Sequence, residues 1–411
     1  MAWSEWTRRT AGCSAGTVPP SLLDMPSSPG HPSLGAFGTT IFATMTQMAL
    51  EKDAVNLGQG FPDTDGPAEV LEAAVEAIRS GRNQYPPGRG FPELRQSVAE
   101  HQERFYGLRH DPVSEVLVTV GATEAIAVAM LALVRPGDEV VMLEPYYDSY
   151  AATVALAGGV RRTSLLRFPD FALDEASLRA AFSDRTRVVL LNTPHNPTGK
   201  VFTREELELV AELAREHDAW VVTDEVYEHL TFDGARHVPM ATLPGMAERT
   251  LTIGSGGKTF STTGWKVGWL TGPAEAVGAA LAVKQFLTFV GSGPFQPAVA
   301  LGLGLPDEVF AGMASDLAGK RERLVDGLRS AGFEVPMPQG GYFAIADAAP
   351  LGVTDATSFC LELPDRAGVV GVPAAAFHDD AEAGATLVRF AFCKRDEVLD
   401  EGVRRLAGLR G

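Results

Sequence analysis

The sequence predicts an α/β protein built on a mostly parallel sheet that helices cover on both faces. From about residue 114 onward, short runs of consecutive apolar residues alternate with helical stretches. Unbroken apolar runs are typical of strands that are buried on both sides, as in parallel sheets. Ligands bind such sheets beyond the carboxyl ends of the strands. Polar or glycine-rich segments follow several of the runs, so we expect a ligand site at that edge.

The order of the predicted elements supports this fold class. The expected strands of the sheet are residues 116–120, 139–143, 187–191, 220–223 and 251–254. A helix over about residues 123–134 is expected after the first strand. Thr203 and Glu206 have the spacing of a capping box, which predicts a helix from there to about His217.

The chain is long enough for one large and one smaller domain, with 411 residues. We expect the sheet to lie in a large domain of residues 65–304. Residues 35–64 and 305–411 are expected to form a smaller α+β domain. That domain would hold a long charged helix near 306–331 and a strand at 387–392.

The N-terminal segment differs from the rest of the chain. Residues 1–34 are rich in Ser, Pro and Gly and show no periodicity, so we expect a loose extension. A true start at Met25 is a hypothesis that the mass of the native N-terminus would test.

Charge and cysteine content exclude several classes of partner. A net charge of −17 argues against nucleic acid or an anionic membrane as the main partner. No apolar run reaches the roughly 18 residues of a membrane span. The cysteines, Cys13, Cys360 and Cys393, have neither zinc-site nor CxxC spacing. We therefore expect no metal and no disulfide framework, in a cytoplasmic protein whose partners are small molecules.

Two side chains at expected strand ends have the chemistry that pyridoxal phosphate requires. Lys258, in a glycine-rich segment after strand 251–254, offers an amine that can form an imine with the cofactor. Asp224 follows strand 220–223, where a partly buried carboxylate needs a cationic partner or several donors. The protonated pyridine nitrogen of the cofactor is such a partner, and it makes the ring an electron sink.

A phosphate site is predicted at the start of the helix after strand 116–120. Ala122 and Thr123 lie where free backbone N–H groups and the helix dipole favour an anion. Ser255 and Lys266 could complete the site with a hydroxyl and a positive charge. Taken alone, the turn before Thr123 is more often an ordinary strand–helix connection.

Other side chains of these segments also have ordinary interpretations. Asp224 could be a helix cap or a salt-bridge partner, and Tyr227 could be a core residue. Asn196 could be a turn residue, and Tyr147 could pack against other aromatic rings. Arg389, in an otherwise apolar strand, could pair with an internal carboxylate or with the α-carboxylate of an amino acid.

Two nucleotide-binding alternatives are disfavoured by missing glycines. A P-loop at the Lys258 segment would need Gly at position 252, where the chain has Thr252. An NAD-dependent oxidoreductase would need G-x-G-x-x-G between a first strand and helix, and this is absent.

A non-enzymatic regulator that only senses the cofactor is a further alternative. It would need a DNA-binding module, for which residues 1–34 are too short and unpatterned.

Taken together, the chain from about Phe42 to the C-terminus resembles fold-type I pyridoxal-phosphate enzymes of the class I/II aminotransferases. Residues 55–63 and 83–85 resemble the kynurenine aminotransferase and cysteine-conjugate β-lyase group. Residues 83–88, 118–125 and 223–232 resemble actinobacterial N-succinyldiaminopimelate aminotransferases still more closely. The resemblance implies the three-layer fold of that family and a homodimer.

The resemblance also implies a role for each matched position that would hold the cofactor. Lys258 binds the cofactor and moves the proton, and Asp224 pairs with the pyridine nitrogen. The remaining cofactor positions are Asn196 and Tyr227 at the ring oxygen, Tyr147 against the ring, Ala122, Thr123, Ser255 and Lys266 at the phosphate, and Tyr85 reaching the phosphate of the neighbouring subunit.

For the substrate, the resemblance implies that Arg389 and Gly60 take the carboxylate near Asn196, and that Phe42 and Phe343 line the pocket. The implied reaction is ping-pong transamination to 2-oxoglutarate. The favoured donor is N-succinyl-L,L-2,6-diaminopimelate, in lysine biosynthesis. The alternative is a kynurenine or glutamine transaminase with cysteine-S-conjugate β-lyase activity. Gly291 and Ser292 stand where the kynurenine group has an aromatic–histidine pair, and small residues there would make room for a longer polar side chain.

Overall fold

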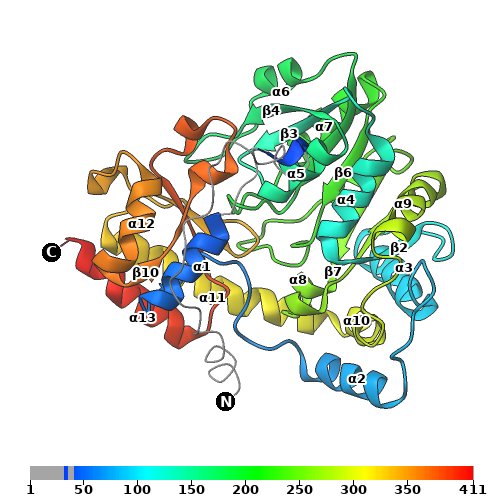
Figure 1. The fold of residues 1–411 in the computed structure, drawn as a ribbon, viewed down its shortest axis with the longest axis horizontal. Helices are drawn as coiled ribbons and strands as arrows, with labels where there is room; N and C mark the ends of the chain where they lie inside the picture. Colours follow the sequence, from blue (N-terminus) through cyan, green and yellow to red (C-terminus); the bar gives the residue numbers. More distant parts are fainter. Residues whose placement is uncertain (1–31, 36–40, 411) are drawn as a thin grey trace, which may run out of the picture.

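The computed structural model describes residues 32–35 and 41–410 and is organised around a seven-stranded sheet (Figure 1). The strand order is β2-β8-β7-β6-β5-β3-β4. Their bounds are Val116–Val120 (β2), Glu139–Glu144 (β3), Val160–Leu165 (β4), Thr186–Asn192 (β5), Trp220–Asp224 (β6), Thr250–Ser255 (β7) and Val267–Thr271 (β8). Strand β8 runs antiparallel to both of its neighbours, β2 and β7, and the other pairs of neighbouring strands are parallel. The predicted mostly parallel sheet is confirmed, and β4 and β8 are strands that were not predicted from the sequence.

Helices pack on both faces of this sheet because successive strand residues point to opposite sides. In β3, Val140 and Met142 belong to one apolar cluster and Val141 and Leu143 to another. The first cluster includes residues of α4 (Gly121–Leu133), α5 (Asp148–Leu156) and α9 (Ala274–Leu287). The second includes residues of α6 (Glu175–Ala181) and α7 (Arg204–Glu216). A third, around β2 and β8, includes α2 (Ala68–Arg79), α3 (Pro92–Tyr106) and α10 (Phe295–Leu303).

The start of α7 confirms the predicted capping box. The Thr203 hydroxyl accepts the N–H of Glu206, and the Glu206 carboxylate accepts the N–H of Thr203. The buried face of the helix carries apolar residues at helical spacing, among them Leu207, Val210 and Ala211. The cap and this spacing explain why the start of α7 can be predicted closely from the sequence.

The C-terminal part forms a second, antiparallel sheet in the order β11-β12-β9. Its strands are Phe343–Asp347 (β9), Val372–Pro373 (β11) and Leu387–Ala391 (β12). The helices of this part are Asp307–Ala331 (α11), Ala356–Ala367 (α12) and Asp396–Leu406 (α13). The expected long charged helix and the expected strand near 387–392 are therefore present.

An N-terminal segment joins this C-terminal part. Strand β1 (Val55–Asn56) pairs in parallel with β10 (Val369–Val370). Helix α1 (Ile41–Glu51), blue in Figure 1, contacts both β10 and α12. These contacts agree with the grouping of residues 35–64 with 305–411, but the domain bounds themselves stay a prediction.

Of the expected N-terminal extension, Pro32–Leu34 forms a short 3₁₀ helix that contacts α5. Met25 and Cys13 lie outside the described residues. Cys360 and Cys393 are buried and free of disulfides. Within the described ranges, no helix has the length and apolar character needed to cross a membrane.

Candidate active site

A cavity of about 450 Å³ lies at the carboxyl ends of the parallel strands. Sheet register explains part of this convergence, because Asn192 at the end of β5 pairs with Asp224 at the end of β6. Every predicted site residue except Tyr85 lines the cavity, namely Phe42, Gly60, Ala122, Thr123, Tyr147, Asn196, Asp224, Tyr227, Ser255, Lys258, Lys266, Phe343 and Arg389. These residues span most of the described sequence, and the fold brings them to one place.

Lys258 lies in the short helix α8 (Gly256–Thr259), directly after β7. Its Nζ atom donates to the hydroxyl of Tyr342 at 2.7 Å. Burial lowers the pKa of the Lys258 amine to about 8, and the charges of Arg389 and Lys266 act in the same direction. A larger share of this amine is therefore neutral at neutral pH than is usual for lysine.

Asp224 is buried, with 5% of its surface exposed, and is not in an ion pair with any described residue. Its Oδ2 atom accepts the Tyr150 hydroxyl at 2.6 Å, and its Oδ1 accepts the Val226 N–H at 3.3 Å. Burial raises the pKa of the carboxyl to about 6. The alternative of a structural salt bridge is therefore not observed among the described residues, and the carboxylate is available to a cationic ligand atom.

Arg389 is a buried cation, 2% exposed, that lacks an acidic ion-pair partner among the described residues. Its guanidinium donates to Asn196 Oδ1 and to the Gly58 carbonyl, each at 3.0 Å, and Nε has no partner. The rings of Phe42, Phe343 and Phe377 lie 5.1, 4.1 and 4.7 Å from the guanidinium carbon. A guanidinium held in this way has donors left for a ligand carboxylate.

The start of α4 forms a positively charged cradle. Gly121, at φ +71°, is so close to Lys266 that an added Cβ would lie 3.2 Å from the Lys266 Nζ. Gly268 allows β8 to approach this turn, because a Cβ there would lie 2.6 Å from the Gly121 carbonyl carbon. Lys266 has no ion-pair partner among the described residues, and Thr123 and Ser255 line the same wall. These groups fit a phosphate.

Several residues that support the site were not predicted from the sequence. Tyr150 bonds Asp224, and Asn192 holds the loop by accepting the Asn196 N–H at 2.7 Å and donating to the Asp224 carbonyl at 2.8 Å. Phe377 covers Arg389, and Tyr342 bonds Lys258. The position of Tyr150 three residues after Tyr147, on the same face of a helix, was the one available sequence signal.

Three residues named in the sequence analysis lie outside the lining of this cavity, namely Tyr85, Gly291 and Ser292. Tyr85 is 80% exposed, and its ring contacts Phe289 edge-on. Gly291 and Ser292 do not line the cavity of their own chain. The Ser292 hydroxyl donates to the carbonyl oxygens of Trp265 and Lys266. The expected effect of Gly291 and Ser292 on this pocket is therefore not seen within one chain.

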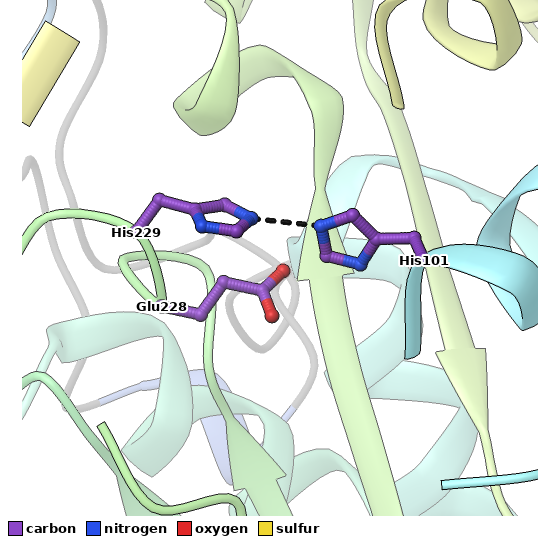
Figure 2. A group of neighbouring side chains, drawn as sticks. All are labelled: His101, Glu228 and His229. Carbon is purple, nitrogen blue, oxygen red and sulfur yellow. Dashed lines mark hydrogen bonds between the residues drawn. The ribbon is translucent and has the colours of Figure 1, made fainter. Parts of the chain in front are cut away.

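A separate group of side chains has metal-binding chemistry. The candidate ligand atoms of His101, Glu228 and His229 all lie within 4.8 Å of one another, and Figure 2 shows the two imidazole rings meeting edge to edge. Their Nε2 atoms share a hydrogen bond of 2.7 Å. Burial lowers the pKa of both imidazoles. Because the Nε2 atoms bond each other and burial favours the neutral rings, we interpret the group as a neutral histidine pair.

The fold and the cavity together define a pyridoxal-phosphate-dependent transferase of fold type I. Comparison with known proteins agrees, because the family described as aminotransferase class I and II matches residues 52–406. The chain belongs to this family. It is an aminotransferase that uses pyridoxal phosphate.

Individual relatives cover nearly the whole chain. A probable N-succinyldiaminopimelate aminotransferase DapC of Mycobacterium tuberculosis is 52% identical, over 92% of this chain and 97% of the relative. The structure of the N-succinyldiaminopimelate aminotransferase from that organism has a TM-score of 0.91 and covers 92% of this chain and 100% of its own. A methionine aminotransferase of Escherichia coli is 38% identical, over 92% and 97%. A kynurenine–oxoglutarate transaminase of Dictyostelium discoideum is 36% identical, over 91% and 95%.

Proposed function

We propose that this aminotransferase moves the amino group of N-succinyl-L,L-2,6-diaminopimelate to 2-oxoglutarate. The observation that carries the proposal is Arg389, a buried cation without an acidic partner among the described residues, in the same cavity as the Lys258 amine. The donor is favoured by the 52% identity to a probable enzyme of that name. Binding both substrates by their α-carboxylates explains how one site can accept them in turn.

Arg389 and its surroundings would orient the substrate. Its free donors would bind the α-carboxylate, and the Asn196 amide, which already accepts from Arg389, keeps N–H groups for the ligand. Position 60 has no room for a side chain, because a Cβ there would lie 2.1 Å from the Phe343 ring, and the Gly60 backbone lines the cavity where the carboxylate would bind. The apolar rings around Arg389 would exclude water and strengthen this ion pair.

The cofactor would be held by the groups described above. Lys266, Ser255 and the N-terminus of α4 would bind its phosphate. Asp224 would pair with the ring nitrogen, and Tyr227 would donate its hydroxyl to the ring oxygen, since burial keeps the pKa of Tyr227 above its usual value. When bound, pyridoxal phosphate supplies an aldehyde that condenses with amines and a ring that accepts electrons released at Cα.

Lys258 would move the proton. Its neutral amine takes the proton from Cα of the donor substrate, which requires the lowered pKa described above. Because the cavity wall holds this amine near the substrate, the reaction needs no base from solution.

We also propose that the working unit is a cytoplasmic homodimer, in which Tyr85 reaches the phosphate site of the partner subunit. The exposed position of Tyr85 supports this arrangement, since its ring is free to contact another chain.

Substrate competition tests the donor. We would measure kcat/KM with 2-oxoglutarate for N-succinyl-diaminopimelate, kynurenine and methionine on one preparation. We expect N-succinyl-diaminopimelate to be preferred by at least about tenfold, which corresponds to about 1.4 kcal/mol of transition-state binding. A preference for kynurenine, or release of pyruvate and ammonia from a cysteine conjugate, would favour the alternative function instead.

A further inference from the structure

Tyr342, just behind the lining of the main cavity, makes the shorter of the two hydrogen bonds that the Lys258 amine donates. It directly precedes β9, and its backbone carbonyl accepts the Phe392 N–H at 3.0 Å. Its ring is buried against the rings of Tyr227 and Phe343, with centroids 5.0 and 4.8 Å away. The position of its hydroxyl is therefore fixed by both backbone and packing.

The hydroxyl of Tyr342 has a defined hydrogen-bonding direction. It donates to the Gly60 carbonyl at 2.8 Å, it also lies in hydrogen-bond contact with the Tyr227 side chain, and its oxygen can accept from the Lys258 amine. Lys258 Nζ donates to it at 2.7 Å and reaches the same carbonyl at only 3.5 Å. Burial raises the pKa of Tyr342 well above its usual value, so the hydroxyl keeps its proton at neutral pH.

Lys258 also has room to move away from the substrate. A second cavity of about 570 Å³, on the side of Pro62–Pro67 and α11, is lined by both Lys258 and Tyr342. A flexible lysine side chain between two cavities can adopt rotamers that turn its amine from the main one. The bond to Tyr342 opposes that movement.

We propose that Tyr342 is a positioning residue that holds the Lys258 amine for proton transfer and ties it to Gly60 in the carboxylate-binding loop. This inference rests on the proposed role of Lys258. Because Gly60 would also receive the substrate carboxylate, the chain Gly60–Tyr342–Lys258 couples the location of the base to substrate binding.

The matched variants Tyr342→Phe and Tyr146→Phe test this proposal. Each removes one buried tyrosine hydroxyl and keeps the ring. The Tyr146 hydroxyl bonds Asp379, outside the cavity lining. Thermal midpoints of both variants would show whether each remains folded.

The first measurement is the rate at which Lys258 takes up the cofactor covalently, and it does not depend on catalytic turnover. Cofactor-free protein is mixed with pyridoxal phosphate, borohydride traps the linkage at intervals, and mass spectrometry quantifies labelled Lys258. We expect Tyr342→Phe to reach the native final extent at a rate about tenfold lower, as for the loss of one hydrogen bond. Tyr146→Phe should match the native rate. Equal rates in all three proteins, or equal slowing in both variants, would overturn the proposal.

The second measurement compares kcat, KM and the kinetic isotope effect of a donor deuterated at Cα. In Tyr342→Phe, kcat should fall about tenfold while KM for the donor changes less than about twofold. The effect of α-deuteration of the donor on kcat should rise, because proton transfer becomes more rate-limiting. An unchanged isotope effect would mean that Tyr342 only packs. If native protein were labelled at a lysine other than Lys258, the proposed function itself would fail, and the two failures are thus distinguishable.

Discussion

The cavity contains three charged side chains whose pKa values are shifted toward the neutral form, namely Lys258, Asp224 and Arg389. All three line the same cavity, where Lys258 is half-buried and Asp224 and Arg389 are buried, and none has an ion-pair partner among the described residues. Burial moves the pKa of each toward its neutral form, to about 8, 6 and 10 respectively. Unpaired buried charges destabilise a fold. Cofactor and substrate carry the complementary charges, so we expect their binding to stabilise the protein.

Replacing Lys258 tests the assignment of the amine. Lys258→Ala should abolish turnover, because Lys266, the other lysine in the described lining of the cavity, belongs to the phosphate cradle. The phosphate cradle and Asp224 remain, so pyridoxal phosphate should still bind without a covalent link. Equilibrium dialysis and borohydride trapping measure both properties, and full activity of the variant would contradict the assignment.

Asp224 should matter more than Tyr227. Asp224→Ala removes a charged partner of the ring nitrogen and should lower kcat by about 100-fold, the scale of a strong charge-assisted hydrogen bond. Tyr227→Phe removes one neutral hydrogen bond and should cost about tenfold or less. Stopped-flow measurement of the first half-reaction compares the two, and equal losses would refute the ranking.

The lowered pKa of Lys258 predicts a pH dependence for cofactor-free protein. The amine reacts with an aldehyde only when neutral, so the rate of covalent uptake should rise about tenfold per pH unit below pH 8 and level off above it. If burial did not lower the pKa, the rise would continue to about pH 10. Trapping experiments between pH 6 and about 10.5 distinguish the two curves.

At the scale of elements, the parts of the site on the main sheet could be predicted because they follow strand ends. Asp224 ends β6, and Lys258 follows β7 within one turn of helix. Parallel neighbours in register bring such ends together, so a local pattern is enough to place them. Strand β4 was missed because its Arg161 and Arg162 break the apolar pattern of a buried strand at the sheet edge.

The start of α7 offers a test of an element away from the cavity. Thr203→Ala removes the cap oxygen and should lower the free energy of unfolding by about 1 kcal/mol. Thr203→Ser keeps an oxygen in place and should recover most of this loss. Urea unfolding measures both variants. Activity should not change, since Thr203 does not line the cavity.

At the scale of the whole molecule, the contacts that complete the site join distant parts of the sequence. Arg389 donates to Gly58 and Asn196, and Tyr342 donates to Gly60. The contacts with Gly58 and Gly60 follow β1, which pairs with β10 from the far end of the chain, and short-range patterns do not encode this pairing. This explains why Tyr342 and Phe377 were missed, while Arg389 stood out as a charge inside an apolar strand.

The proposed dimer predicts complementation between two inactive chains. If Tyr85 acts on the partner's site, a hybrid of Lys258→Ala and Tyr85→Ala subunits contains one intact site of two. Random co-assembly should then restore about a quarter of native activity. Co-expressed Lys258→Ala and Asp224→Ala should restore none, because both residues belong to the cavity of one chain. Activity no greater than the sum of the parents would contradict a shared site.

The most direct measurement is a single half-reaction followed by absorption. Purified protein saturated with pyridoxal phosphate is mixed with N-succinyl-diaminopimelate in the absence of any keto acid. We predict that the absorption of the lysine-bound cofactor disappears and returns when 2-oxoglutarate is added. Kynurenine at the same concentration should leave the absorption largely unchanged. Loss of the absorption with kynurenine but not with N-succinyl-diaminopimelate would contradict the proposed substrate.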